Sequence, residues 1–287
     1  MNWPDIVNAM FGGIGEYGAI LALVANSVWA GAVLGLVGGL IGVFVVQRDM
    51  AFAVHGISEL SFAGAAAALL FGFDVVTGSI LGSLIAAAMI GLLGARARER
   101  NSIIGVLMPF GLGLGILFLS LYNGRSANRF SLLTGQIVSV QNAQLGWLGG
   151  ICAVVLIALL LIWRPLRFDS LDPQSAAARG VPTRTVSLVF MVLLGLVVAV
   201  AVHIIGALLV LALLVTPAAA ASRVATRPLL LPVLAAVFGV VSAVGGILLA
   251  VAGTLPVSPY ITTISFVIYL VCRGIGARRD RVARSLV

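Results

Sequence analysis

Residues 185–222 read TVSLVFMVLLGLVVAVAVHIIGALLVLALLVTPAAAAS and contain no Asp, Glu, Lys or Arg. A helix that crosses a bilayer needs about 20 apolar residues, so this run must hold two crossings. Four further uncharged runs occupy residues 19–46, 75–95, 143–163 and 228–272. None of them has the alternating pattern of a membrane β-barrel strand. The sequence therefore predicts an all-α, polytopic membrane helical bundle.

The composition agrees with a protein that lies mostly in lipid. Hydrophobic residues make up 61% of the chain and charged residues 9%, whereas a soluble globular chain averages about 25% charged residues. Cys152 and Cys272 both lie inside apolar runs, so we interpret them as small core residues and not as a disulfide. The net charge of +8 is better explained by orientation in the membrane than by nucleic-acid binding.

We expect about nine crossings in a single transmembrane domain over residues 1–287. They lie near residues 19–46, 53–73, 75–94, 103–122, 144–163, 186–202, 206–222, 229–251 and 260–272. This arrangement puts 15 of the 17 basic residues on one face, and Arg concentrates in cytoplasmic loops. The basic tail over residues 274–287 is therefore expected in the cytoplasm, and residues 1–18 form an external lead-in.

Small residues recur at every fourth position in two of the predicted helices. The two rows are Gly31, Gly35 and Gly39, and Gly64, Ala68 and Gly72. Because lipid provides little hydrophobic force between helices, such rows allow close backbone approach and dispersion contacts. We expect both rows in the core of the bundle, since a row alone does not identify a dimer interface.

His55 and Glu59 are the most distinctive polar residues within an apolar helix. At positions i and i+4 they share one helix face, and an ionisable group in the bilayer core is costly, so it usually faces a bundle interior or an aqueous path. Imidazole and carboxylate suit Zn or Mn, but the spacing fits a structural pair equally well. His203 is interpreted more simply, as an imidazole that hydrogen-bonds a neighbouring backbone, with a pathway role as the lesser alternative.

Residues 172–180 predict a short capped helix on the cytoplasmic face. Asp172 is a good N-cap, Pro173 suits the first helical position, and Gly180 suits the left-handed stop. A self-capped helix between two crossings favours a rigid part that docks to another protein, although an ordinary turn helix would have the same pattern.

Pro217 interrupts the apolar helix of residues 206–222. It removes a backbone hydrogen bond and predicts a kink or break that exposes carbonyls near Leu213 and Thr216. Broken helices often line transport paths, and a packing kink is equally compatible. The sequence has no GxxxxGK[ST] motif and no nucleophile–base set, so we expect neither ATP hydrolysis by this chain nor another enzymatic activity.

Taken together, these segments resemble the ABC-3 family of permeases, the membrane subunits of zinc, manganese and iron importers. The family motif DPxxAxxxG is met by Asp172, Pro173, Ala176 and Gly180, and residues 206–221 resemble its GxLLVxALLxxPAAxA helix. The stretches VVQRDMAF (residues 45–52) and SLLTGQIVS (residues 131–139) and the small-residue end of residues 64–72 also fit.

The resemblance implies the type II ABC importer permease fold in a bacterial plasma membrane. It implies a homodimer of permeases, two ATPase subunits and an external metal-binding protein, with residues 172–180 as the coupling helix. Relatives usually carry DAxSH where this chain has His55 and Glu59 in exchanged order. The exchange keeps the ligand types and the helix face, and it favours a transit site for metal.

The expected function is therefore a permease for divalent manganese or zinc, with no resident cofactor and with ATP used only by the partner subunit. One alternative is a permease of the same architecture for an iron–siderophore or corrinoid. Another is a gradient-driven secondary transporter in which Glu59 relays protons.

Overall fold

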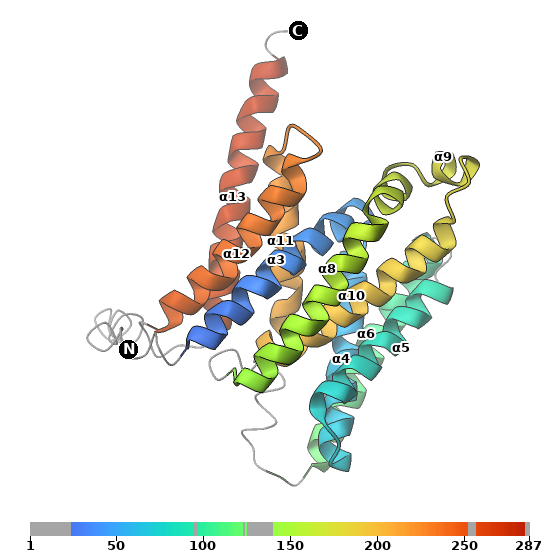
Figure 1. Cartoon of the computed structure of the whole chain (residues 1–287), viewed down its shortest axis with the longest axis vertical. Helices are drawn as coiled ribbons and strands as arrows, with labels where there is room; N and C mark the ends of the chain where they lie inside the picture. Colours follow the sequence, from blue (N-terminus) through green and yellow to red (C-terminus); the bar gives the residue numbers. More distant parts are fainter. Residues whose placement is uncertain (1–23, 94–96, 123, 125–139, 252–256, 285–287) are drawn as a thin grey trace. The chain divides into compact units, whose positions relative to one another are not determined.

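The structure, a computed structural model, describes residues 24–93, 97–122, 124, 140–251 and 257–284. In this part of the chain, ten α-helices and no strand are present (Figure 1). The helices are α3 (Ala25–Gln47), α4 (Ala51–Phe71), α5 (Val75–Leu93), α6 (Ala97–Leu121), α8 (Asn142–Leu171), α9 (Pro173–Ala178), α10 (Thr183–Ile205), α11 (Ala207–Val224), α12 (Leu230–Val251) and α13 (Val257–Arg284). The predicted all-α fold is confirmed.

Eight of the described helices are long and apolar enough to cross a membrane, and α11 is a shorter apolar helix. Each of the nine predicted crossings therefore corresponds to a helix, and α9 is the additional short one. Two helices extend well beyond their apolar runs: α8 continues through Pro165 to Leu171, and α13 continues to Arg284. The predicted lead-in (residues 1–18) and the stretch of residues 131–139 lie outside the described residues.

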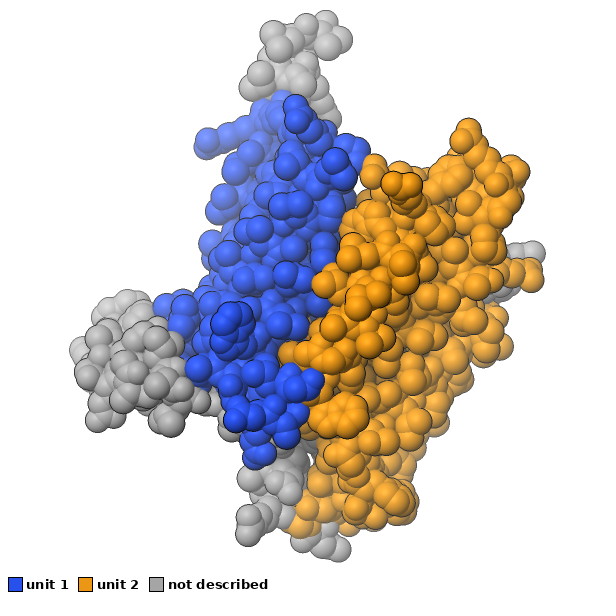
Figure 2. Space-filling view, in the orientation of Figure 1, with its two compact units in different colours: residues 1–43, 137–146, 212–287 blue, residues 44–136, 147–211 orange. Residues whose placement is uncertain are grey.

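The chain forms two compact units (Figure 2). Unit 1 comprises Met1–Val43, Ile137–Gly146 and Ala212–Val287, and unit 2 comprises Phe44–Gln136 and Trp147–Leu211. Because of this division, α3, α8 and α11 each begin in one unit and end in the other.

In unit 1, α3 and α12 approach each other closely. A Cβ atom on Gly35 would lie 2.5 Å from the carbonyl oxygen of Gly239, and one on Gly31 would lie 2.5 Å from the side chain of Ile247. Gly39 meets the backbone of Ala235 in the same way. The predicted row of glycines is therefore confirmed as a helix contact, because only a residue without a side chain lets the two backbones come this close.

In unit 2, α4 packs against α5, α6 and α10. Gly64 faces the carbonyl of Gly78 on α5, and Gly111 of α6 faces the backbone of Leu60. The prediction for Gly72 as part of this row is wrong, since its φ of 75° and the empty space around it show that it ends the helix. Glycine is favoured there because it adopts the left-handed conformation without strain.

Buried hydroxyl groups add polar contacts to the apolar packing of unit 2. The hydroxyl of Ser61 on α4 donates to the carbonyl of Ser79 on α5 at 3.0 Å. The hydroxyl of Ser79 in turn donates to the carbonyl of Ala199 on α10 at 3.1 Å. Both serines are at most 1% exposed, so each bond satisfies a group that has no access to solvent.

Candidate functional site

His55 and Glu59 lie in the first half of α4, and the structure brings their side chains together. The helix begins at Ala51, so the spacing of four residues places both on one face. The imidazole Nε2 of His55 is 3.6 Å from the carboxylate Oε1 of Glu59. The Glu59 side chain is 6% exposed and that of His55 is 31% exposed. The carboxylate is therefore buried, and the imidazole is partly exposed.

This geometry is compatible with two ligands of one cation. Two donor atoms that each lie about 2.1 Å from a metal ion are about 3.0–3.5 Å apart, close to the separation between these Nε2 and Oε1 atoms. In the described residues, no group of three or more His, Cys, Asp or Glu side chains could hold a metal.

The short helix α9 has the capping predicted from the sequence. The carboxylate of Asp172 accepts hydrogen bonds from the backbone N–H of Ser175 at 3.0 Å and from its hydroxyl at 2.5 Å. These two bonds hold the pKa of Asp172 below its usual value. Pro173 is the first helical residue, Ala176 is fully buried, and Gly180 has a φ of 82°. The helix is thus capped at both ends by the residues that flank it directly.

His203 lies near the end of α10, and its hydrogen bonding differs from the prediction. Neither ring nitrogen has a hydrogen-bond partner, although both are buried, so the predicted bond to a neighbouring backbone is absent. The imidazole interacts electrostatically with Asp74, which precedes α5. The carboxylate of Asp74 is engaged by the backbone N–H and the hydroxyl of Thr77, both at 2.8 Å, and these bonds are the main reason that its pKa is lowered.

Thr216 and Pro217 lie within α11, and of the predicted kink or break the break is absent. The helix is continuous from Ala207 to Val224 across Pro217. The carbonyl of Leu214 faces Gly42 of α3, where a Cβ atom would overlap it, and a Cβ atom on Gly38 would be in contact with the side chain of Leu214 at 3.4 Å. The turn of α11 before Pro217 is therefore packed closely against α3. A pathway role for Thr216 and Pro217 stays a prediction.

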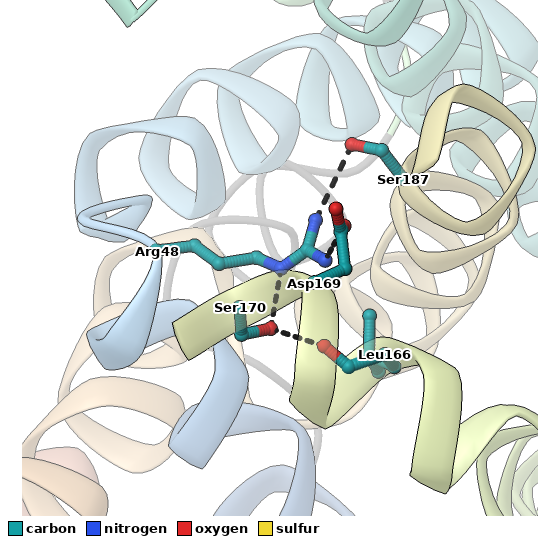
Figure 3. A network of polar contacts seen from close by, with 5 residues as sticks. All are labelled: Arg48, Leu166, Asp169, Ser170 and Ser187. Carbon is teal, nitrogen blue, oxygen red and sulfur yellow. Dashed lines mark hydrogen bonds and ion pairs between the residues drawn. The ribbon is translucent and has the colours of Figure 1, made fainter. Parts of the chain in front are cut away.

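The sequence did not predict a polar cluster around Arg48 (Figure 3). Arg48 follows α3 directly, and its guanidinium forms an ion pair with Asp169. Its Nε donates to the hydroxyl of Ser170 at 2.7 Å, and its Nη1 donates to that of Ser187 at 3.3 Å. The two charged side chains are 10% and 6% exposed. The only sequence signal was an arginine directly after an apolar run, and its partners are more than 120 positions away.

Comparison with known sequences identifies one family over most of the chain. The ABC 3 transport family matches residues 21–274. The manganese transport system membrane protein MntC of Halalkalibacterium halodurans is 33% identical over 223 residues, which cover 77% of this chain and 76% of that protein. The manganese import system permease protein ScaB of Streptococcus parasanguinis is 28% identical over 262 residues, covering 91% and 93% of the two chains.

A solved structure has the same fold. A chain of PsaBC from Streptococcus pneumoniae in complex with Fab superposes with a TM-score of 0.80 at 27% sequence identity. The superposition covers 90% of this chain and 95% of that one. The likeness thus extends over nearly all of both chains.

Proposed function

The chain belongs to the ABC 3 transport family and is a multi-pass membrane permease, and on this basis we propose that it moves manganese ions inward through a site at His55 and Glu59. Such a permease subunit has no catalytic activity of its own. The observation that carries the proposal is the 3.6 Å approach of the imidazole and the buried carboxylate on α4.

Manganese is the first choice of cargo because relatives that match most of this chain are named as manganese transport proteins. Zinc is the competing cargo, since one imidazole and one carboxylate suit both ions and sites of this kind generally bind Zn²⁺ more tightly than Mn²⁺. A transit site must also release its ion. We therefore assign high affinity to an external metal-binding protein and weaker binding to His55 and Glu59.

The proposed assembly contains two copies of this permease, two ATPase subunits and the external metal-binding protein. Asp172, Pro173, Ala176 and Gly180 would form the coupling helix on which an ATPase docks. The caps at both ends of α9 support this assignment, because a docking part must keep its shape under load. In the proposed assembly, the C-terminus lies in the cytoplasm of a bacterial cell and the protein lies in its plasma membrane.

The test is manganese and zinc uptake by cells that express His55→Ala or Glu59→Gln in place of the native chain. We expect both variants to accumulate little metal while they still assemble with the ATPase, because each loses one ligand without loss of helix packing. Metal uptake at the native level in both variants would show that this site on α4 is not part of the transport pathway. Uptake that requires an added siderophore would instead favour a permease for a metal chelate.

Asp49→Asn is the matched control for Glu59→Gln. Asp49 is an exposed carboxylate in the turn just before α4, and its φ is 52°. Asparagine adopts this left-handed conformation readily, so the control removes a negative charge near the same helix and keeps the turn. We expect uptake in Asp49→Asn to match that of the native chain.

A further inference from the structure

We propose that Arg48 is a positioning residue that transmits displacement of the α9 region to the helix that carries His55 and Glu59. The inference rests on the proposed function, because it takes α9 as the place where the ATPase acts and α4 as the place where the ion passes. Nothing in the family resemblance or in the expected site residues assigns a role to Arg48.

The guanidinium joins the two helices that flank α9. Asp169 and Ser170 lie in the last turn of α8, just before α9, and Ser187 lies in the first turns of α10, just after it (Figure 3). Ser170 is itself fixed, since its hydroxyl donates to the carbonyl of Leu166 at 2.6 Å. One side chain therefore holds both ends of the segment that contains the coupling helix.

The backbone of Arg48 lies in the short junction between α3 and α4. Only Arg48, Asp49 and Met50 separate the two helices. Backbone hydrogen bonds from Asp49 N–H to the carbonyl of Val46 at 3.3 Å and from Met50 N–H to that of Val45 at 2.9 Å close this turn. The junction is thus short and bonded, so a force on the guanidinium acts directly on the start of α4.

His55 is the fifth residue of α4, so it lies about one helical turn beyond the junction. The carbonyl of Arg48 also accepts a hydrogen bond from the guanidinium of Arg100 on α6 at 3.1 Å. Because α6 packs along α4 beside Glu59 and Leu60, this bond ties a second helix of the candidate site to the same junction. All of these residues belong to unit 2.

Arginine suits this position better than lysine would. Its planar group offers five N–H donors in a fixed fork, and here three nitrogens reach three different side chains. The guanidinium also lies 5.4 Å from the ring centroid of Phe190 on α10. A lysine can keep the charge opposite Asp169 but cannot hold α8 and α10 together with the same directional bonds.

The test uses the complete complex of permease and ATPase in proteoliposomes, supplied with the external metal-binding protein, and measures two rates, manganese uptake and ATP hydrolysis. For Arg48→Ala we expect ATP hydrolysis to continue and manganese transported per ATP to fall by about tenfold or more, the size expected when a charge-assisted hydrogen bond is lost. A purely structural role would lower the amount of complex and leave this ratio unchanged. A native ratio in Arg48→Ala overturns the proposal.

Milder variants keep the proposal testable if Arg48→Ala does not assemble. Ser187→Ala removes only the contact with α10, and Asp169→Asn keeps the shape and removes the charge. We expect a reduced ratio in both and an intermediate ratio in Arg48→Lys, and unchanged ratios in Ser187→Ala and Asp169→Asn overturn the proposal. Arg273→Ala, which removes an exposed arginine from α13, is the control and should behave as native.

The native complex separates this inference from the proposed function. If the native complex hydrolyses ATP but moves no manganese, or does not bind an ATPase, the proposed function fails. If the native complex transports manganese and the Arg48 variants transport it with the same ratio, only the inference about Arg48 fails.

Discussion

The carbonyl oxygen of Gly64 occupies the position that a Cβ atom of Gly78 would need, and the reverse is also true. The two helices α4 and α5 therefore meet backbone against backbone at this point, on the side of α4 roughly opposite to His55 and Glu59. This contact sets how closely α4 and α5 approach each other, because any side chain at either position would push the helices apart.

Gly64→Ala or Gly78→Ala should consequently destabilise the protein. The added methyl group has no room, and overpacking of this kind costs about 1–3 kcal/mol. Gly113→Ala on α6 is the control, because a Cβ atom there meets nothing within 4 Å. Thermal unfolding in detergent should show a lower midpoint for the first two variants only. Equal midpoints for all three would show that α4 and α5 are not in direct backbone contact.

Ser79→Ala should lower the free energy of unfolding by about 0.6 kcal/mol and by at most about 1.7 kcal/mol. These are the average and the largest values for hydrogen bonds between membrane helices. The variant removes the bond from α5 to the carbonyl of Ala199 on α10 and takes away the hydroxyl that lies 2.7 Å from that of Ser61. Ser120→Ala is the comparison, since this exposed hydroxyl bonds only within its own helix at Leu117. The double variant Ser61→Ala/Ser79→Ala should lose less stability than the sum of the losses in the two single variants, because the two hydroxyl groups share a hydrogen bond.

Asp172→Ala should weaken association with the ATPase, whereas Asp172→Asn should leave it near the native level. Asparagine and aspartate cap helices about equally well, and alanine does not cap at all. The amount of ATPase that co-purifies with the permease measures the effect. If the Asp172→Asn variant behaves like the Asp172→Ala variant, the charge of Asp172 and not its capping would be what the ATPase requires.

The cap at Asp172 should also be insensitive to pH over the physiological range. Its pKa is lowered by the two bonds from Ser175, so the stabilisation is fully present above the ordinary aspartate pKa of about 3.9 and is lost only as the pH falls through the lowered value. Between about pH 5 and 8, the amount of ATPase that co-purifies with the permease should therefore depend on pH in the same way for the native chain and for Asp172→Asn.

His203→Leu should raise stability by up to about 1 kcal/mol. The imidazole nitrogens are buried without partners, and an unsatisfied polar group costs about 1–3 kcal/mol, part of which an apolar side chain of similar size recovers. Thermal unfolding and manganese uptake should be measured on the same preparation, and we expect uptake to be retained. A stable variant without uptake would instead assign His203 to the transport path.

The candidate site was predictable to the extent that its residues are close in the sequence. His55 and Glu59 are one helical turn apart, so periodicity alone placed them on one face, and the caps of α9 depend on residues within the same nine positions. The contacts of Arg48 could not be predicted, because Asp169 lies 121 positions away and the pattern of either segment alone fits a solvated charge equally well.

Local sequence patterns were enough to specify the helical fold, the approximate positions of the apolar helices that the structure describes, the glycine row on α3 and the capped helix α9, since each follows from hydrophobic runs, spacing or local backbone preference. Folding in three dimensions settled which helices meet, that Gly72 ends α4 instead of packing in it, and that α11 continues through Pro217. These outcomes depend on what stands opposite each residue after folding, such as the glycines of α3 against α11. Contacts between distant segments depend on the joint packing of many helices, and no local pattern encodes them.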